Sequence, residues 1–173
     1  MQDLAVHQLT EIEQQLPKDK GTYLLFFTLE QTLTCDVGKF AQVTLQPGVY
    51  AYVGSAFGSG GLKARLRHHL KINQRCHWHL DYLRPHMQFI QLWLTQDLQR
   101  REHQWAGIMQ AWRCVSIPIE GLGASDCQCR GHFFQMKKVP AIATFRKKLR
   151  AENWLEDNIL QVVRPNPQEV RAD

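Results

Sequence analysis

One stretch of the sequence, PGVYAYVGSAFGSGGLKARLRHHL, constrains the fold most because it predicts a strand, a glycine-rich loop and a helix in succession. Residues 49–53 are mostly β-branched or aromatic, which favours a strand, and Gly54 is expected to end it. The glycines that follow permit a tight turn before the helix. In the helix, a leucine at every fourth position predicts a buried stripe. The turn glycines are Gly58, Gly60 and Gly61, and the stripe is Leu62, Leu66 and Leu70.

Polar groups are expected to converge where this strand, loop and helix meet. Tyr50 and Tyr52 are two residues apart and therefore share one face of the strand. Arg65 and His69 are four residues apart, at the edge of the leucine stripe. Free backbone amides at a helix start attract anions, so the stretch predicts a phosphate-binding site. The candidates for direct contact with that phosphate are Ser55, Gly60 and Gly61.

Two short motifs give the chain a resemblance to the GIY-YIG nucleases. Gly21-Thr22-Tyr23 matches the first motif of that family, and Tyr52-Val53-Gly54 matches the second. Gly48-Val49-Tyr50 also spells the first motif, but Tyr50 shares a predicted strand with Tyr52 and leaves no room for a turn between them. We therefore assign Tyr23 to the first motif. The two motif tyrosines are 29 residues apart, which implies an insertion relative to most GIY-YIG domains.

The resemblance extends to the charged residues of the family's site. Arg65 stands where the family's helix has its essential arginine, and His69 stands where the family has tyrosine or histidine. Glu102 lies 37 residues beyond Arg65, a spacing similar to that of the family's metal-binding glutamate. A closer match is to a branch of the superfamily marked by HWHxDYL and a later SDCxC segment, and the resemblance covers roughly residues 21–134.

The resemblance implies a metal-dependent endonuclease that hydrolyses phosphodiester bonds in DNA. Glu102 would hold one divalent cation, Mg²⁺ or alternatively Mn²⁺, through hard oxygen ligands. The cation and Arg65 would stabilise negative charge on the phosphorus centre and the leaving oxygen. Tyr23 or Tyr52 would accept a proton from the attacking water, which requires a pKa below the value of about 10 for free tyrosine. His69 would orient the water or share the proton transfer.

The position of Glu102 within its predicted helix supports a special role independently of the resemblance. An apolar stripe predicts a helix over residues 97–112, and Glu102 falls inside that stripe. An ionised carboxylate that faces a core is costly without a cation or a donor nearby. Glu102 therefore either meets a buried arginine or lines a cleft and holds a metal, with Arg65 as the candidate neighbour in both cases. The stripe consists of Leu98, Trp105, Met109 and Trp112.

The segment HWHLDYL offers a second group of candidate metal ligands. His77, His79 and Asp81 alternate with mostly apolar residues, so a strand would place all three on one face. On a helix, His77 and Asp81 share a face and His79 does not. The alternative is that these residues cap and brace the turn before the next strand, and the sequence leaves both interpretations open.

A third group lies in the segment PIEGLGASDCQCRGH. Cys127, Cys129 and His132 can supply three zinc ligands, with His77 or His79 as a fourth. A CxC spacing is a weaker zinc signal than CxxC, and a second cysteine pair is missing. Zinc is therefore not the favoured interpretation, and small thiols buried in a turn are expected instead.

The remaining patterns predict an α/β fold in the loose α+β sense, a small, mostly antiparallel β-sheet flanked by helices. The resemblance implies that its arrangement is GIY-YIG-like. We expect one domain over residues 1–163, with an N-terminal helix and a C-terminal helical extension, followed by a loose tail over residues 164–173. Further helices are predicted over residues 3–16 and from residue 143 through AENWLEDNIL. Further strands are predicted over residues 22–29, 32–37, 42–45 and 88–95, with residues 133–139 as either a last strand at the sheet edge or a short extension.

Composition narrows the class of protein. The apolar fraction of 44% without a long apolar run argues against a membrane protein. An acidic N-terminal segment is unlike a signal peptide, and five cysteines without an export signal indicate a reducing, cytoplasmic location. The net charge of +5 and the pI near 9.1 are compatible with a DNA partner but do not by themselves establish one.

Three classes of function are compatible with the sequence. The first is the metal-dependent DNA endonuclease. The second is a nucleic-acid-binding module that keeps the scaffold without cutting. The third is an interaction protein stabilised by zinc at the HWHLD and CQC segments.

Overall fold

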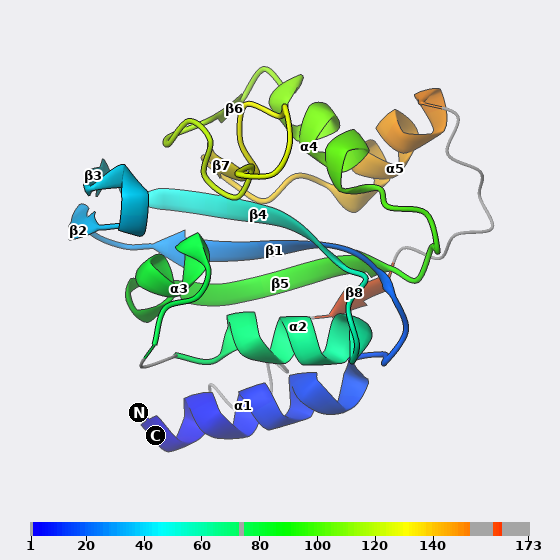
Figure 1. Cartoon of the computed structure of the whole chain (residues 1–173), viewed down its shortest axis with the longest axis horizontal. Helices are drawn as coiled ribbons and strands as arrows, with labels where there is room; N and C mark the ends of the chain where they lie inside the picture. The colour runs from blue at the N-terminus through cyan, green and yellow to red at the C-terminus, as the bar shows by residue number, and fades with distance from the viewer. Residues whose placement is uncertain (1, 73–74, 153–160, 164–173) are drawn as a thin grey trace.

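A six-stranded antiparallel sheet forms the centre of the molecule in the computed structural model, which describes residues 2–72, 75–152 and 161–163 (Figure 1). The strand order is β6-β7-β4-β1-β5-β8. The strands are β1 (Gly21–Leu29), β4 (Gly48–Ala56), β5 (Gln88–Thr95), β6 (Val115–Ser116), β7 (Phe133–Met136) and β8 (Gln161–Val163). The predicted α+β class with a mostly antiparallel sheet is therefore confirmed.

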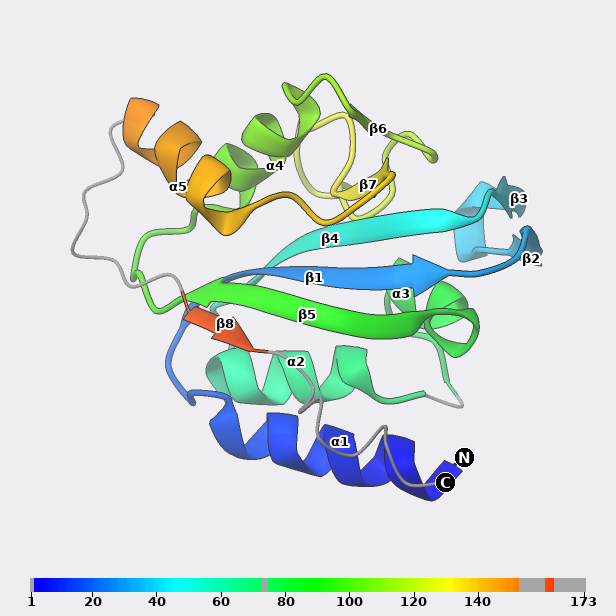
Figure 2. The same cartoon turned by 180° about the vertical axis from the view of Figure 1, so that it is seen from behind.

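Helices cover both faces of this sheet (Figures 1 and 2). On one face lie α1 (Gln2–Gln15), α2 (Gly61–Leu70) and α3 (His79–Leu83), with α2 between the sheet and α1. On the other face lie α4 (Glu102–Gln110) and α5 (Ile142–Ala151). Side chains that alternate along β1 therefore enter two different cores. Leu25 packs with the stripe of α2, whereas Leu24 packs with Trp105 of α4 and Phe145 of α5.

Gly54 does not end its strand as predicted, because β4 continues to Ala56. In the register of β4 on β1, Gly54 pairs with Tyr23. A Cβ atom on Gly54 would lie 2.3 Å from the Tyr23 hydroxyl oxygen. The glycine thus serves a close approach between neighbouring strands rather than a turn.

Several other boundaries differ from the sequence-based expectations. The strand β7 is not at the sheet edge, because β6 pairs with it on the far side from β4. The strands predicted over residues 32–37 and 42–45 are present as β2 (Leu33–Asp36) and β3 (Gln42–Leu45), which pair with each other in a separate two-stranded sheet. Two short 3-10 helices are η1 (Gly38–Phe40), between β2 and β3, and η2 (Arg84–His86), between α3 and β5. The predicted helix over AENWLEDNIL and the tail over 164–173 lie largely or wholly outside the described residues.

The helix that holds Glu102 is shorter than predicted. It begins at Glu102 rather than near Asp97, and Leu98 is 79% exposed instead of forming part of the buried stripe. Trp105 and Met109 are fully buried on the same helix face as Glu102. The predicted burial of this face is confirmed, but Glu102 occupies the first turn rather than the middle of the helix. In the part of the chain that the structure describes, no helix has the length and apolar character needed to cross a lipid bilayer.

Candidate functional site

A cleft of about 350 Å³ opens at one end of the sheet and brings together side chains from β1, β4, α2 and α4. All five residues predicted as catalytic line it. They are Tyr23, Tyr52, Arg65, His69 and Glu102.

The position of this cleft follows from the unequal lengths of two neighbouring strands. The strand β7 pairs with β4 from Val49 to Tyr52, whereas β4 continues to Ala56. Beyond Tyr52, one edge of β4 lacks a strand partner among the described residues, although the Val53 amide donates to the carbonyl of His132. Side chains from both faces of the sheet can reach the space beside this edge. This explains how Glu102, from a helix on one face, shares a cleft with residues of α2 on the other.

The two motif tyrosines are diagonal neighbours on paired strands. Tyr23 pairs with Gly54, and Tyr52 lies two residues earlier on β4, so both rings project from the same face. Because Gly54 has no side chain, the Tyr23 ring can lie across it. Tyr50 is fully buried and donates its hydroxyl to the carbonyl of Gln46 at 2.5 Å, which agrees with the assignment of Tyr23 to the first motif.

His69 lies beneath this pair of tyrosines. Its ring centroid is 5.9 Å from that of Tyr23 and 5.6 Å from that of Tyr52, and Trp78 lies 6.2 Å away. Burial among these rings, together with the charge of Arg65, lowers the pKa of His69 to about 3. The imidazole is therefore neutral at neutral pH, and its buried Nδ1 atom makes no hydrogen bond within the described part of the chain. The low pKa makes the neutral ring a weak base until negative charge enters the cleft.

Burial shifts both tyrosines in the direction opposite to that expected for a base. It raises the pKa of Tyr23 and Tyr52 well above the usual value, and the opposing charge of Arg65 does not overcome the effect. Both hydroxyls are therefore protonated at neutral pH. Their chemical role in this arrangement is to donate hydrogen bonds.

Two arginines face the cleft, each against an aromatic ring. The Arg65 guanidinium lies 4.0 Å from the ring centroid of Trp78, and that of Arg100 lies 4.9 Å from the ring centroid of Phe57. Stacking restrains a guanidinium while leaving its edge free to donate hydrogen bonds. Two cations on one cleft indicate an anionic ligand.

The Glu102 carboxylate is held from two sides. Ser55 Oγ donates to Oε2 at 2.5 Å, and His132 Nδ1 lies 3.1 Å from Oε1. Burial raises the pKa of the carboxyl group, but the contacts with His132 and Ser55 outweigh it, so the pKa lies below its usual value. Glu102 is therefore ionised at neutral pH, and 20% of its side chain remains exposed to the cleft. The contacts of Glu102 are with a serine and a histidine, whereas the sequence named Arg65 as the candidate neighbour.

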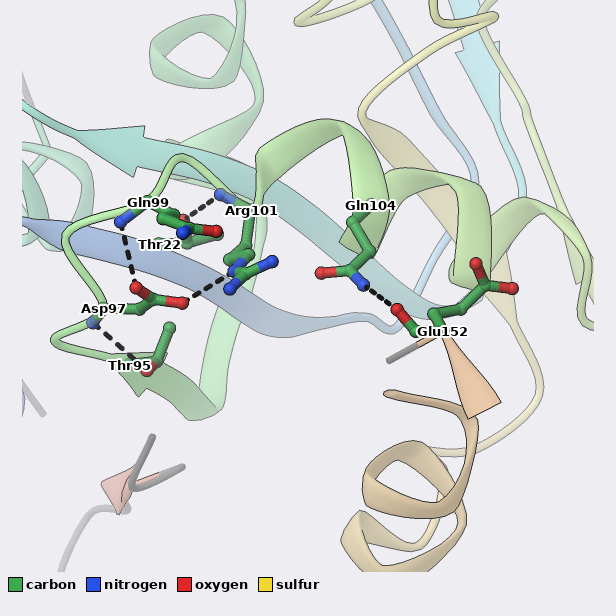
Figure 3. A network of polar contacts seen from close by, with 7 residues as sticks. All are labelled: Thr22, Thr95, Asp97, Gln99, Arg101, Gln104 and Glu152. Carbon is green, nitrogen blue, oxygen red and sulfur yellow. Dashed lines mark hydrogen bonds and ion pairs between the residues drawn. The ribbon is translucent and has the colours of Figure 1, made fainter. Parts of the chain in front are cut away.

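A polar network fixes the turn that leads into Glu102 (Figure 3). The Asp97 carboxylate accepts from the backbone amide of Gln99 at 2.9 Å and from Arg101 Nε at 2.6 Å. The backbone amide of Arg101 donates to Thr22 Oγ1 at 3.1 Å. This last bond connects the residue before Glu102 to the strand that holds Tyr23, so the carboxylate and the tyrosine have a common support.

The predicted phosphate site at the start of α2 is wrong. The Leu62 amide donates to the carbonyl of Asp19 at 2.8 Å, and the Lys63 amide donates to that of Pro17 at 2.9 Å. A Cβ on Gly61 would lie 2.1 Å from the Lys18 carbonyl oxygen, so the glycine serves this packing. Neither Gly60 nor Gly61 is among the described residues that line the cleft, whereas Ser55 lines it and bonds Glu102.

His77, His79 and Asp81 do not form the predicted cluster on a strand, because α3 begins at His79. Asp81 is buried, and its Oδ2 atom accepts from the amides of His77 and Trp78 at 2.9 and 3.0 Å and lies 3.0 Å from His68 Nε2. These bonds cap the start of α3, whereas the alternative to a metal cluster had these residues brace the turn before the next strand. The rings of His77 and His79 line the cleft.

Cys127, Cys129 and His132 do come together, with His103 of α4 as the fourth member. The fourth residue is therefore neither His77 nor His79. One potential ligand atom from each of the four lies within 4.8 Å of the others. A metal ion can be held by this group.

Sequence reasoning missed several residues of the site. Arg100, Ser125 and Asp126 line the cleft, and His103 joins the cysteines. Their contributions depend on contacts between segments far apart in the chain. Arg100 lies inside the helix predicted over residues 97–112, where a basic residue gives no signal of its own.

One family model matches the chain, over residues 22–154, and is described as Domain of unknown function DUF123. No curated protein and no solved structure matches the chain.

Proposed function

The chain belongs to this family, whose description assigns no chemistry, and we propose from its own residues that it is a metal-dependent endonuclease that hydrolyses phosphodiester bonds in DNA. The finer assignment to the GIY-YIG superfamily is part of this proposal. The observation that carries it is the meeting of two tyrosines, an arginine, a histidine and a glutamate in one cleft. Tyr52, Arg65 and His69 were expected to meet from the strand, loop and helix stretch alone, whereas Tyr23 of β1 and Glu102 of α4 join them from elsewhere in the chain.

The donors around Glu102 fit a hard divalent cation such as Mg²⁺. Glu102 is ionised and partly exposed at the cleft wall, and Asp126 adds a second, exposed carboxylate to the lining. Mg²⁺ in enzymes is commonly held by one or two carboxylates, with water and substrate phosphate as its other ligands. When bound, the ion supplies Lewis-acid stabilisation of charge on the phosphate oxygens.

Arg65 binds and orients the scissile phosphate. Its planar donors match two phosphate oxygens, and its charge stabilises the additional negative charge of the transition state. Stacking on Trp78 keeps the guanidinium in place before the substrate arrives. Arg100 contacts a neighbouring phosphate of the same strand from the other side of the cleft.

His69 accepts the proton of the attacking water, directly or through a tyrosine hydroxyl. It is neutral at neutral pH, and a bound phosphodiester brings negative charge that strengthens it as a base. Tyr23 and Tyr52 remain protonated and donate hydrogen bonds that orient the water and the phosphate. The expected role of a tyrosine as primary base is therefore replaced by a relay to the histidine.

The test is a cleavage screen of the purified full chain with Mg²⁺ or Mn²⁺ over single-stranded, duplex, branched and damaged DNA. Glu102→Gln is the matched variant, because the amide keeps the shape of the side chain but is a poor ligand for a hard cation. We expect cation-dependent cleavage by the wild type and a loss of roughly 10²-fold or more in the variant. DNA binding without cleavage on every substrate would favour the non-catalytic binding module, and full activity of Glu102→Gln would refute the assignment of the metal ligand.

A further inference from the structure

The cluster of two cysteines and two histidines contains none of the residues to which we assign catalysis, although its His132 lies against Glu102. His103 is the second residue of α4. Cys127 and Cys129 lie in the loop before β7, and His132 directly precedes β7. Three of the four side chains are at least partly buried. All of the chain's cysteines are free thiols in the structure, including the two in this cluster.

Distances within the cluster match a single tetrahedral ion. Cys127 Sγ lies 3.6 Å from His132 Nε2, and Cys129 Sγ lies 3.3 Å from His103 Nδ1. Zinc bonds of about 2.3 Å to sulfur and 2.0–2.1 Å to nitrogen, at tetrahedral angles, place these atoms about 3.6 Å apart. An iron–sulfur cluster with two metal atoms would require wider separations between the histidine and cysteine ligands than the 4.8 Å limit that encloses this set.

The kinds of donor select the metal. Two thiolates and two imidazoles in a tetrahedral arrangement are typical of structural zinc sites, whereas Mg²⁺ takes oxygen ligands. We infer that His103, Cys127, Cys129 and His132 bind one zinc ion, at a site separate from the cation site at Glu102. The sequence did not favour zinc, because the CxC spacing is a weak signal and only three candidate ligands lie close together in the chain. The fourth ligand, His103, is remote from them in sequence.

A zinc ion at this position would hold one wall of the cleft. The loop from Ile117 to Gly131 contains no helix or strand, yet it contributes Gly123, Ser125 and Asp126 to the lining. Zinc bound to a loop and to α4 at once closes the loop against the helix that presents Glu102. The metal thus stabilises a segment that has no helix or strand of its own.

His132 connects the zinc site with the catalytic carboxylate. Its Nε2 atom faces Cys127 Sγ, and its Nδ1 atom faces Glu102 Oε1 at 3.1 Å. A metal bound at Nε2 places the ring proton on Nδ1, the nitrogen that lies 3.1 Å from the carboxylate. His132 is then a positioning residue for Glu102, and this part of the inference rests on the proposed function.

Metal analysis of the purified full chain tests the zinc site without any assay of cleavage. We expect about one zinc per chain in the wild type and loss of that zinc in Cys127→Ser and Cys129→Ser. Cys76→Ser and Cys114→Ser are matched controls, because both cysteines are exposed and lie outside the cluster. Glu102→Gln should also keep its zinc, since Glu102 is not a ligand.

Two spectroscopic measurements on the wild type keep the inference testable if a variant fails to fold. Cobalt(II) in place of zinc should give the intense ligand-field bands of a tetrahedral site and a thiolate charge-transfer band. Histidine-ring ¹H–¹⁵N spectra of the zinc-loaded protein should show His132, assigned by its loss in His132→Cys, with its proton on Nδ1.

A zinc-free protein with octahedral cobalt bands, or a Cys127–Cys129 disulfide, would overturn the zinc site. A proton on Nε2 would overturn the connection to Glu102. Zinc binding in a protein that cleaves no DNA would leave the zinc site in place and count against the proposed function alone.

Discussion

Replacing Gly54 by alanine should test the packing that creates the site, because Gly54 lies directly across from Tyr23 in the strand register. An added Cβ would lie 2.3 Å from the Tyr23 hydroxyl oxygen, 2.5 Å from Cζ and 2.9 Å from Cε2. The Tyr23 side chain is only 2% exposed, so its ring cannot move away from the added methyl group without disturbing the residues packed around it. Inserting a methyl group into such a contact costs about 1–3 kcal/mol. For a domain of this size, that loss lowers Tm by about 2–12 °C.

Gly58→Ala is the control for this experiment, since nothing lies within 4 Å of the position of its Cβ. Both substitutions remove the same backbone freedom from the unfolded chain, so the difference between their Tm values isolates the contact with Tyr23. Thermal unfolding followed by circular dichroism measures both. Gly58→Ala should melt at or slightly above the wild-type temperature. If Gly54→Ala melts together with Gly58→Ala, the tyrosine does not lie across the glycine and the described geometry of the cleft is refuted.

Two further substitutions test the electrostatics. His69→Phe should reduce the acid sensitivity of folding: because the pKa of His69 falls from about 6.5 unfolded to about 3 folded, the unfolded state binds the extra proton between these values. The free energy of unfolding of the wild type should therefore fall by up to about 1.4 kcal/mol per pH unit below pH 6.5. Urea titrations at several pH values measure this slope, with His86→Phe, at an exposed histidine, as the control. If His69→Phe keeps the wild-type slope, His69 is not its source. Asp81→Asn should lower stability by about 1–3 kcal/mol at neutral pH through its two backbone donors and His68. The pKa of Asp81 is lowered because those bonds outweigh burial, so this contribution is present above the unfolded pKa and is lost as pH falls through the folded pKa; equal stability of variant and wild type at pH 7 would contradict it.

Local sequence patterns were sufficient for the main elements and for most of the site. Runs of β-branched and aromatic residues placed β1 and β5, and the leucine repeat placed α2. The ordered motifs selected Tyr23, Arg65 and Glu102, which line one cleft. These features depend on contacts within a strand or a helix turn, or on a resemblance that spans the chain.

Contacts between distant segments account for what the sequence did not predict. Backbone amides near the start of α2 donate hydrogen bonds to the carbonyls of Pro17 and Asp19. These amides are therefore not free to bind a phosphate, as the glycine-rich loop had suggested. His103 approaches the cysteines only because α4 packs beside the loop before β7. Asp97 engages the turn before α4 through its side chain, which removes Leu98 from the helix and exposes it.

The most direct test of a catalytic cleft compares DNA affinity and single-turnover cleavage in Arg65→Ala, because a transition-state contact and a simple anchor affect the two differently. Arg67→Ala is the matched control, since Arg67 lies on the same helix, is 57% exposed and pairs with Glu13. We expect Arg65→Ala to slow cleavage by about 10²–10³-fold. DNA affinity should fall little, and the slope of log affinity against log salt should decrease by no more than the contribution of about one phosphate contact. Arg67→Ala should leave cleavage near the wild-type rate. Equal losses of affinity and cleavage in Arg65→Ala would contradict the catalytic assignment.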